Sequence, residues 1–186
     1  FSDITVLKQS QERLDYLAHY DPLTGLPNRL LFWIRLEHAL QRAERSGHPV
    51  AVLCFDLDHF RDFNDSLGHR LGDQLLQAIA ERLQHVVRRE DTLARLEGDE
   101  FVIALEQLTE GEDAARLAHH LLQALTAPFL LRHQELFVGA SIGISVYPQD
   151  GQSAESLLKN AEAAMFRAKD AGRNTYQFYA LDMTAH

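Results

Sequence analysis

The chain has 186 residues, of which 46% are hydrophobic, and a formal net charge of −9. This length suits one globular domain with short flanking segments. The negative charge argues against nucleic acid polymers and anionic membranes as main partners, and no apolar run approaches the ~20 residues that cross a bilayer. The single cysteine, Cys54, cannot form an internal disulfide, which favours a reducing, cytoplasmic compartment, where the chain could also be part of a membrane-associated protein.

The first 19 residues are predicted to form a helix, because Ile4, Leu7, Leu14 and Leu17 recur at roughly helical spacing among polar residues. No apolar core is apparent behind this helix, and the chain begins with phenylalanine rather than methionine. We therefore expect residues 1–19 to be a connector from an upstream domain.

The rest of the chain alternates between helical and strand-like patterns. The turn-rich segment Asp21–Asn28 leads into a predicted helix from Arg29 to about Arg45, which Asn28 can cap. The further expected elements are a buried strand over Val50–Phe55, helices from about Phe60 and over Gly72–Val87, a hairpin of Thr92–Leu96 and Phe101–Leu105, a helix over Glu112–Leu125, a strand over Phe137–Tyr147, a helix over Ser153–Ala171 and a strand over Tyr176–Tyr179. This order predicts an α+β domain with helices packed on a mainly antiparallel sheet.

Acidic residues gather at two places where strands are expected to end. The predicted hairpin turn carries Glu97, Asp99 and Glu100, and the segment Asp56-Leu57-Asp58 ends another apolar run. If the hairpin neighbours the first strand, Asp56 and Asp99 converge on one Mg²⁺, and the backbone carbonyl of Leu57 becomes a further ligand. The alternative is that these acids are solvated turn residues, which are common at strand ends.

Two further pairs each have a functional and a structural interpretation, and a third has only a structural one. Asn64 and Asp73 can hydrogen-bond the edge of a guanine or can cap helices. Lys169 and Arg173, four positions apart, can bind a polyphosphate or complement a helix dipole. The run that contains Arg88 and Asp91 is, on composition alone, a solvated charged face.

The order of these motifs resembles the GGDEF family, the diguanylate cyclase domains, over about residues 20–180. The resemblance rests on the D-x-L-T-x-L-x-N-R pattern of Asp21–Arg29, on FDLDHFRDFNDSLGHRLGD at Phe55–Asp73, on RLEGDEF, on Ser141–Ser145 and on AKDAGRN at Ala168–Asn174. The tail over Phe178–His186 resembles the junction that leads into a phosphodiesterase domain of the EAL family, so residues 181–186 are expected to lead to a possible downstream domain.

The resemblance implies a fold like the palm of nucleotidyl cyclases and polymerases, with a five-stranded sheet. It implies condensation of two GTP molecules into cyclic di-GMP and pyrophosphate by a homodimer of half-sites, with Mg²⁺ or Mn²⁺ as cofactor. By position, Asp56, the Leu57 carbonyl and Asp99 would hold the metal, with Asp99 and Glu100 as the catalytic acids. Substrate contacts would come from Phe60, Arg61, Asn64, Asp73, Gly98, Lys169 and Arg173, and product inhibition from Arg88 and Asp91.

The hairpin departs from the family pattern at its first glycine, which is Glu97 here. A carboxylate about 6 Å from a phosphate charge is repelled by about 3 kcal/mol at an effective dielectric near 20, and by almost nothing if it points into water. Arg61 stands where the family usually has lysine, which keeps the charge but alters its geometry. The alternative function is therefore a weak or inactive domain that binds GTP or cyclic di-GMP and regulates an attached domain.

Overall fold

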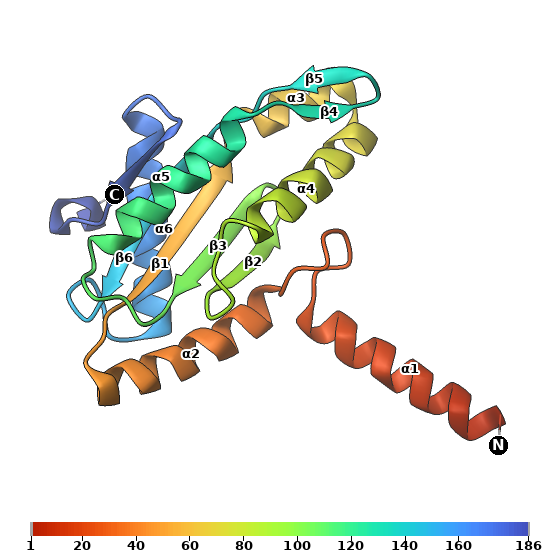
Figure 1. Ribbon diagram of the computed structural model, residues 1–186, viewed down its shortest axis with the longest axis horizontal. Helices are drawn as coiled ribbons and strands as arrows, with labels where there is room; N and C mark the ends of the chain where they lie inside the picture. Colours follow the sequence, from red (N-terminus) through yellow and green to blue (C-terminus); the bar gives the residue numbers. More distant parts are fainter. Residues whose placement is uncertain (1, 186) are drawn as a thin grey trace.

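A five-stranded sheet with the strand order β2-β3-β1-β6-β7 forms the centre of the computed structural model, which describes residues 2–185 (Figure 1). The strands are β1 (Val50–Leu57), β2 (Thr92–Glu97), β3 (Glu100–Leu105), β6 (Ala140–Tyr147) and β7 (Thr175–Phe178); β4 (Phe129–Leu131) and β5 (Gln134–Leu136) form a separate hairpin. The helices are α1 (Ser2–His19), α2 (Arg29–Ser46), α3 (Phe60–Leu67), α4 (His69–Gln84), α5 (Asp113–Thr126), α6 (Ala154–Asp170) and the 3₁₀ segment η1 (Leu181–Ala185).

The sheet is antiparallel except at one edge. Strand β1 pairs with β3 on one side and with β6 on the other, and β2 pairs with β3, all antiparallel, whereas β7 runs parallel to β6. The predicted α+β fold with a mainly antiparallel sheet is therefore confirmed. Among the described residues, no helix combines the length and the apolar composition needed to cross a bilayer.

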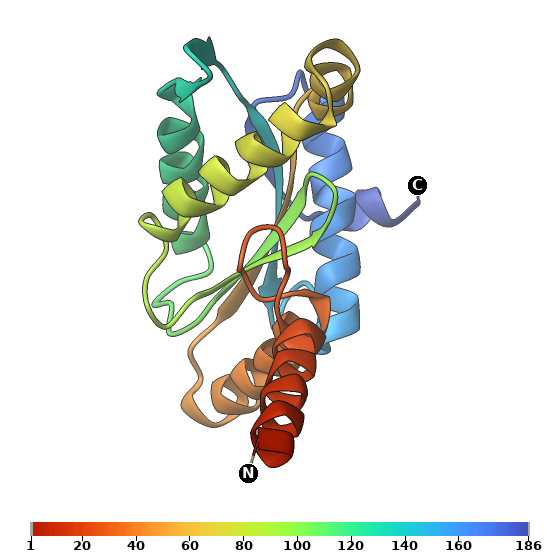
Figure 2. The same ribbon diagram turned by 90° about the vertical axis from the view of Figure 1, so that its right-hand side faces the viewer.

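Alternation along β1 divides the core into two layers. Leu53 and Phe55 belong to the cluster formed with α4 and α5, whereas Val52 and Cys54 pack with α2 and α6. Figure 2 shows α4 and α5 on one face of the sheet and α6 on the other. Burial of a Val, Leu or Phe side chain stabilises the fold by about 2 kcal/mol. Because both faces of β1 are buried, its side chains favour a position at the centre of the sheet.

Helix α6 lies directly on β6 at Gly143. A Cβ atom at residue 143 would overlap the α6 backbone at Ala161 and Met165. The Ser145 hydroxyl donates a hydrogen bond of 2.6 Å to the Leu157 carbonyl on the same helix. The close approach that glycine permits therefore sets the position of α6, and with it the position of Lys169 in the last turn of α6.

The predicted strand over Phe137–Tyr147 is wrong at its start, since β6 begins only at Ala140. The apolar character of Phe137 does not reflect burial in the sheet, because its side chain is 72% exposed. Residues 129–136, for which no element was predicted, form the β4–β5 hairpin. Arg82 of α4 holds this hairpin by donating to the carbonyls of Ala127 and Pro128.

Helix α4 also differs from its predicted bounds, since it begins at His69 and ends at Gln84 rather than spanning Gly72–Val87. Gly68, with φ of +94°, separates α3 from α4 and allows α4 to start earlier than its apolar pattern indicates. Helix α1 projects from the body of the molecule (Figure 1). Its side chains are mostly exposed, and its last turn is held by the Asn28 amide, which donates to the Ala18 carbonyl at 2.9 Å.

Candidate functional site

The end of β1 carries the centre of the candidate site. In the sheet register, Asp56 lies between Glu100 of β3 and Ser141 of β6. The backbone N–H of Leu57 donates to the carbonyl of Asp99 at 3.3 Å. The turn between β2 and β3 therefore does neighbour the end of β1, and the structure brings Asp56, Leu57, Asp99 and Glu100 together.

Two acids of this cluster have raised pKa values. Burial is the main cause of the raised pKa of Asp99, and the negative charge of Asp56 adds to it. Burial also raises the pKa of Glu100 to about 7, with further contributions from Asp56 and Glu162. Since like charges this close destabilise each other, the cluster favours either a proton or a cation.

The polar atoms at Asp56 fit a divalent cation. Lys169 of α6 contacts Asp56 Oδ2 at 2.6 Å, while Asp56 Oδ1 is buried and has no hydrogen-bond partner. The described residues contain no group of three or more His, Cys, Asp or Glu side chains arranged to hold a metal alone. Mg²⁺ typically takes one or two carboxylates and completes its shell with substrate phosphates and water. Asp56, Asp99 and the Leu57 carbonyl are the candidate donors for such a partial set.

Asp58 has a different environment from Asp56. Its carboxylate accepts hydrogen bonds from the Ser141 hydroxyl at 2.6 Å and from the Asn174 backbone N–H at 2.8 Å, and Arg173 lies 3.8 Å away. Both Arg173 and Asn174 have positive φ values. Asp58 therefore connects the end of β1 to the loop after α6, and the cation Arg173 faces Asp58 while Lys169 faces Asp56.

The candidate guanine residues lie on α3 and α4. Asn64 packs against Gly72, where a Cβ atom would overlap the Asn64 Oδ1 atom, and that buried oxygen has no hydrogen-bond partner. Asp73, next along α4, is exposed. The ring of Phe60 is buried in the core, whereas Arg61 is exposed and close enough to Asp99 to lower its pKa against the larger effect of burial.

Glu97 occupies the signature position without backbone strain. It pairs with Glu100 after a bulge in β2, its φ is not positive, and its side chain is exposed. Gly98 is the residue of the turn with a left-handed φ, of +50°. The backbone therefore accepts glutamate at position 97. Glu97 does act electrostatically, since its charge contributes to the raised pKa of Glu100 as the smallest of the causes identified.

The candidate product site contains an intact ion pair. The Arg88 guanidinium lies 3.2 Å from Asp91, whose side chain is nearly fully buried, and it also donates to the Glu106 carbonyl at 2.8 Å. Hydrogen bonding to Asp91 raises the pKa of Arg88. A neighbouring cavity of about 360 Å³ is lined by Arg88 and Asp91 together with Arg116 and His120.

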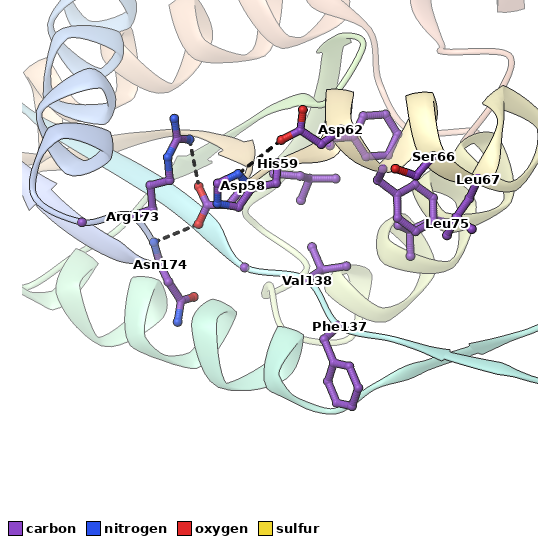
Figure 3. Close-up of a pocket in the computed structure, with 15 residues that line it drawn as sticks. Asp58, His59, Asp62, Ser66, Leu67, Leu75, Phe137, Val138, Arg173 and Asn174 are labelled. Atoms are coloured by element: carbon purple, nitrogen blue, oxygen red, sulfur yellow. Dashed lines mark hydrogen bonds and ion pairs between the residues drawn. The ribbon is translucent and has the colours of Figure 1, made fainter.

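A larger cavity of about 590 Å³ lies beside the end of β1 (Figure 3). Asp58, Arg173 and Asn174 form one part of its lining, and Phe137 and Leu67 form an apolar part. The lining includes Leu57 but none of the acids of the β2–β3 turn. This cavity therefore adjoins the acidic cluster and does not contain it.

Sequence reasoning missed three residues that shape the site. Arg95 donates to the Gly98 carbonyl and to Asp21, both at 2.9 Å, and so holds the turn. Glu162 lies two helical turns before Lys169 on α6, a spacing that could have placed it on the same face. Asp58 was seen as part of an acidic segment but received no role, and its partner Ser141 becomes apparent only from the sheet register.

Comparisons with known proteins identify the family of this chain. The family model described as "Diguanylate cyclase, GGDEF domain" matches residues 18–175, and the chain therefore belongs to the GGDEF family. The bifunctional diguanylate cyclase/cyclic di-GMP phosphodiesterase MucR of Pseudomonas aeruginosa is 48% identical over 98% of this chain and 26% of its own length. The cyclic di-GMP phosphodiesterase NbdA of the same species is 42% identical over 94% of this chain and 22% of its own length.

The fold match is close as well. The solved GGDEF domain of TpbB from P. aeruginosa has a TM-score of 0.87 and 38% identity, covering 90% of this chain and 98% of that domain. This match and the family membership confirm the expected cyclase-type fold, and the chain is homologous to diguanylate cyclases. The chain spans only 26% and 22% of the two full-length relatives, so what those whole proteins do is not assigned to it.

Proposed function

We propose that this domain is a diguanylate cyclase, which condenses two GTP molecules into cyclic di-GMP and pyrophosphate. The observation that carries the proposal is the meeting of Asp56, Asp99 and Glu100 at the end of β1, where Asp56 retains a buried oxygen without a partner. Acids so placed disfavour their own charges, and a metal-bound nucleotide relieves that repulsion.

The residues take the following roles in this proposal. Asp56, the Leu57 carbonyl and Asp99 hold Mg²⁺ or Mn²⁺, which when bound neutralises charge on the phosphates. Asn64 and Asp73 bind the guanine edge. Arg61, Lys169, Arg173 and the backbone at Phe60 and Gly98 contact the rest of the nucleotide. The buried, unpartnered Asn64 Oδ1 supports a ligand contact, because such atoms usually have a partner.

The cyclic product needs two phosphodiester bonds, and each forms when a ribose 3′-oxygen of one GTP bonds to the α-phosphorus of the other. The bond from that phosphorus to the bridging oxygen breaks, pyrophosphate leaves, and the 3′-hydroxyl loses its proton. Glu100 or Asp99 accepts this proton, because both carboxylates lie beside the proposed metal at the end of β1. The remaining work of the chain is to position two nucleotides in line.

One domain offers one set of these residues, so we propose that catalysis needs a homodimer in which two half-sites face each other. Helix α1 supports this role, because Ile4, Leu7 and Leu14 are 73%, 70% and 68% exposed.

We further propose that residues 1–19 connect to an upstream sensory domain, that residues 20–180 form the catalytic unit, and that residues 181–186 lead to a downstream domain, an EAL domain being one candidate. We also propose a cytoplasmic location, which the proposed use of GTP and the single cysteine support.

Arg88 and Asp91 are proposed to bind cyclic di-GMP as an inhibitory product. The support is a guanidinium held by a buried carboxylate at the edge of a cavity, a geometry that suits recognition of a phosphate or a guanine edge. Arg88 is also connected to β3, because it donates a hydrogen bond to the carbonyl of Glu106, the residue that directly follows that strand.

GTP turnover with Mg²⁺ tests the cyclase proposal. We expect the wild-type domain to form cyclic di-GMP, and Asp99→Ala to lower the rate at least about a hundredfold, because a metal-binding and catalytic acid is lost. We expect Glu97→Gly to raise kcat/KM by less than about tenfold, since the exposed Glu97 side chain is well screened. No cyclic di-GMP above the Asp99→Ala background would contradict the proposal.

The second candidate is a regulatory domain that binds GTP or cyclic di-GMP without turnover. It is favoured by Glu97 beside Glu100 and by homologues with phosphodiesterase names. A hundredfold gain on Glu97→Gly, from a wild type that binds GTP by calorimetry but turns it over no faster than Asp99→Ala, would support this candidate against the first.

A further inference from the structure

The two cations proposed to bind phosphate each face a carboxylate of the same short segment. Lys169 Nζ lies 2.6 Å from Asp56 Oδ2, and the two side chains are only 22% and 16% exposed. Arg173 lies 3.8 Å from Asp58, and the Arg173 side chain is 42% exposed. The first pair is therefore short and largely shielded from water, whereas the second is long and open.

The two carboxylates also differ in the hydrogen bonds that remain to them when their cation moves away. Asp58 retains hydrogen bonds from Ser141 and Asn174, so Arg173 can leave at little cost. Asp56 already has one buried oxygen without a partner, and the loss of Lys169 would leave its charge uncompensated. A largely buried carboxylate that loses its ion-pair partner is strongly disfavoured, so Lys169 can leave only if another cation replaces it.

We propose that Lys169 is an internal counter-ion of Asp56 that a divalent cation displaces, and that this exchange releases the Lys169 ammonium to the nucleotide phosphates. The inference rests on the proposed function, which assigns the metal to Asp56 and a phosphate contact to Lys169. A metal that binds alone must compete with Lys169 for Asp56. A nucleotide that binds alone must compete with Asp56 for Lys169. Metal and nucleotide therefore bind together much better than either does alone.

The second contact of Lys169 is compatible with this movement. Its ammonium lies 5.0 Å from the ring centroid of Phe166, which is half exposed on α6. Such a contact is weak at an exposed site and leaves the side chain able to change its direction. The exchange would therefore move the Lys169 ammonium from its strong ion pair with Asp56 to a solvent-facing position near the end of α6.

Mn²⁺ binding without nucleotide, followed by electron paramagnetic resonance, tests the exchange. Lys169→Met keeps a long apolar side chain and removes the competing charge, so we expect Mn²⁺ to bind about tenfold more tightly. The same variant should bind GTP, at a fixed saturating Mn²⁺ concentration, about tenfold more weakly. These opposite changes are the signature of an exchange, because general damage to the fold would weaken both affinities.

Three variants serve as controls. Lys159→Met removes an exposed lysine from the same helix and should leave both affinities and turnover unchanged. Arg61→Met removes a positive charge that acts on Asp99 but forms no ion pair with Asp56 among the described residues, and should change Mn²⁺ affinity less than twofold. In an Asp56→Asn background, Lys169→Met should no longer tighten Mn²⁺ binding.

The outcomes separate this inference from the proposed function. Unchanged or weaker Mn²⁺ binding by Lys169→Met, in a domain whose wild type makes cyclic di-GMP, overturns the exchange and leaves the cyclase proposal standing. An equal gain in Mn²⁺ affinity in Arg61→Met also overturns the exchange, because the gain would then follow from the change in net charge alone. Tighter Mn²⁺ binding in a wild-type background that turns over no GTP supports the exchange and refutes the cyclase. If no variant binds Mn²⁺, the exchange and the metal site at Asp56 are both wrong.

Discussion

At the scale of single residues, the buried acids at the β2–β3 turn lower the stability of the fold when they are charged. Glu100 carries a pKa raised to about 7, chiefly by burial, and the pKa of Asp99 is raised in the same direction. The cation proposed to bind here would relieve this repulsion between carboxylates.

The raised pKa of Glu100 predicts a pH dependence of folding in the presence of a chelator. Between its ordinary value of 4.5 and about 7, the folded protein holds a proton that the unfolded chain has lost. The free energy of unfolding should therefore fall as pH rises from about 4.5 to 7, and Asp99 adds to the same trend. Since Glu100 is only half buried, we expect its share to be about 1–2 kcal/mol.

Urea unfolding with EDTA at pH 5, 6, 7 and 8 measures this effect. The Glu100→Gln variant should lose less stability over this range than the wild type, because its side chain does not ionise. Some slope should remain in the variant from Asp99. Parallel curves for the two proteins would show that the Glu100 carboxylate does not carry the raised pKa.

At the scale of elements, Arg95 joins the signature turn to the segment that follows α1. Its guanidinium contacts Asp21 at 2.9 Å, with both side chains 14% exposed, and donates to the Gly98 carbonyl. Its backbone N–H donates to the Pro27 carbonyl at 3.1 Å. Asp21 in turn accepts hydrogen bonds from the Thr24 hydroxyl and backbone N–H. The position of the turn therefore depends on a loop about 70 residues away in sequence.

Arg95→Met tests this connection. Removal of the guanidinium leaves the Asp21 carboxylate without its ionic partner, so we expect the free energy of unfolding to fall by about 2–4 kcal/mol. Adding Asp21→Asn should recover part of this loss, because the unpaired charge is removed. Urea denaturation of the single and double variants measures both effects. Arg35→Met, at an exposed position of α2, is the matched control; an equal loss in that variant would contradict the argument.

At the scale of the whole molecule, α1 stands apart from a domain whose two core layers are already complete. The apolar residues of α1 are exposed, with Leu7 70% and Leu14 68% accessible, while α2, α4, α5 and α6 cover the sheet. Exposed apolar residues on one stripe of a projecting helix are characteristic of association surfaces. Dimerisation through α1 would bring two half-sites under the control of whatever precedes the helix.

Placing charges on this stripe should weaken the dimer. For Leu7→Lys combined with Leu14→Lys, we expect a dimer dissociation constant raised at least about tenfold in sedimentation equilibrium, because apolar burial is lost and like charges meet. Turnover per domain should fall at low protein concentration and recover at high concentration. Glu12→Lys, on the opposite side of α1, should leave the dissociation constant unchanged. Unaltered self-association in the double variant would place the dimer interface elsewhere.

The sequence by itself determined most helices and strands, though not the bounds of α4, and the identity of the acids, because these depend on local periodicity, caps and the order of motifs. It also identified the family, whose motifs lie in separate short segments. Only the tertiary structure decided that Lys169 faces Asp56 across 113 positions, that Arg173 faces Asp58, and that Glu97 points into solvent. These contacts depend on the register of β1 between β3 and β6 and on the close approach of α6 at Gly143, which no local pattern encodes.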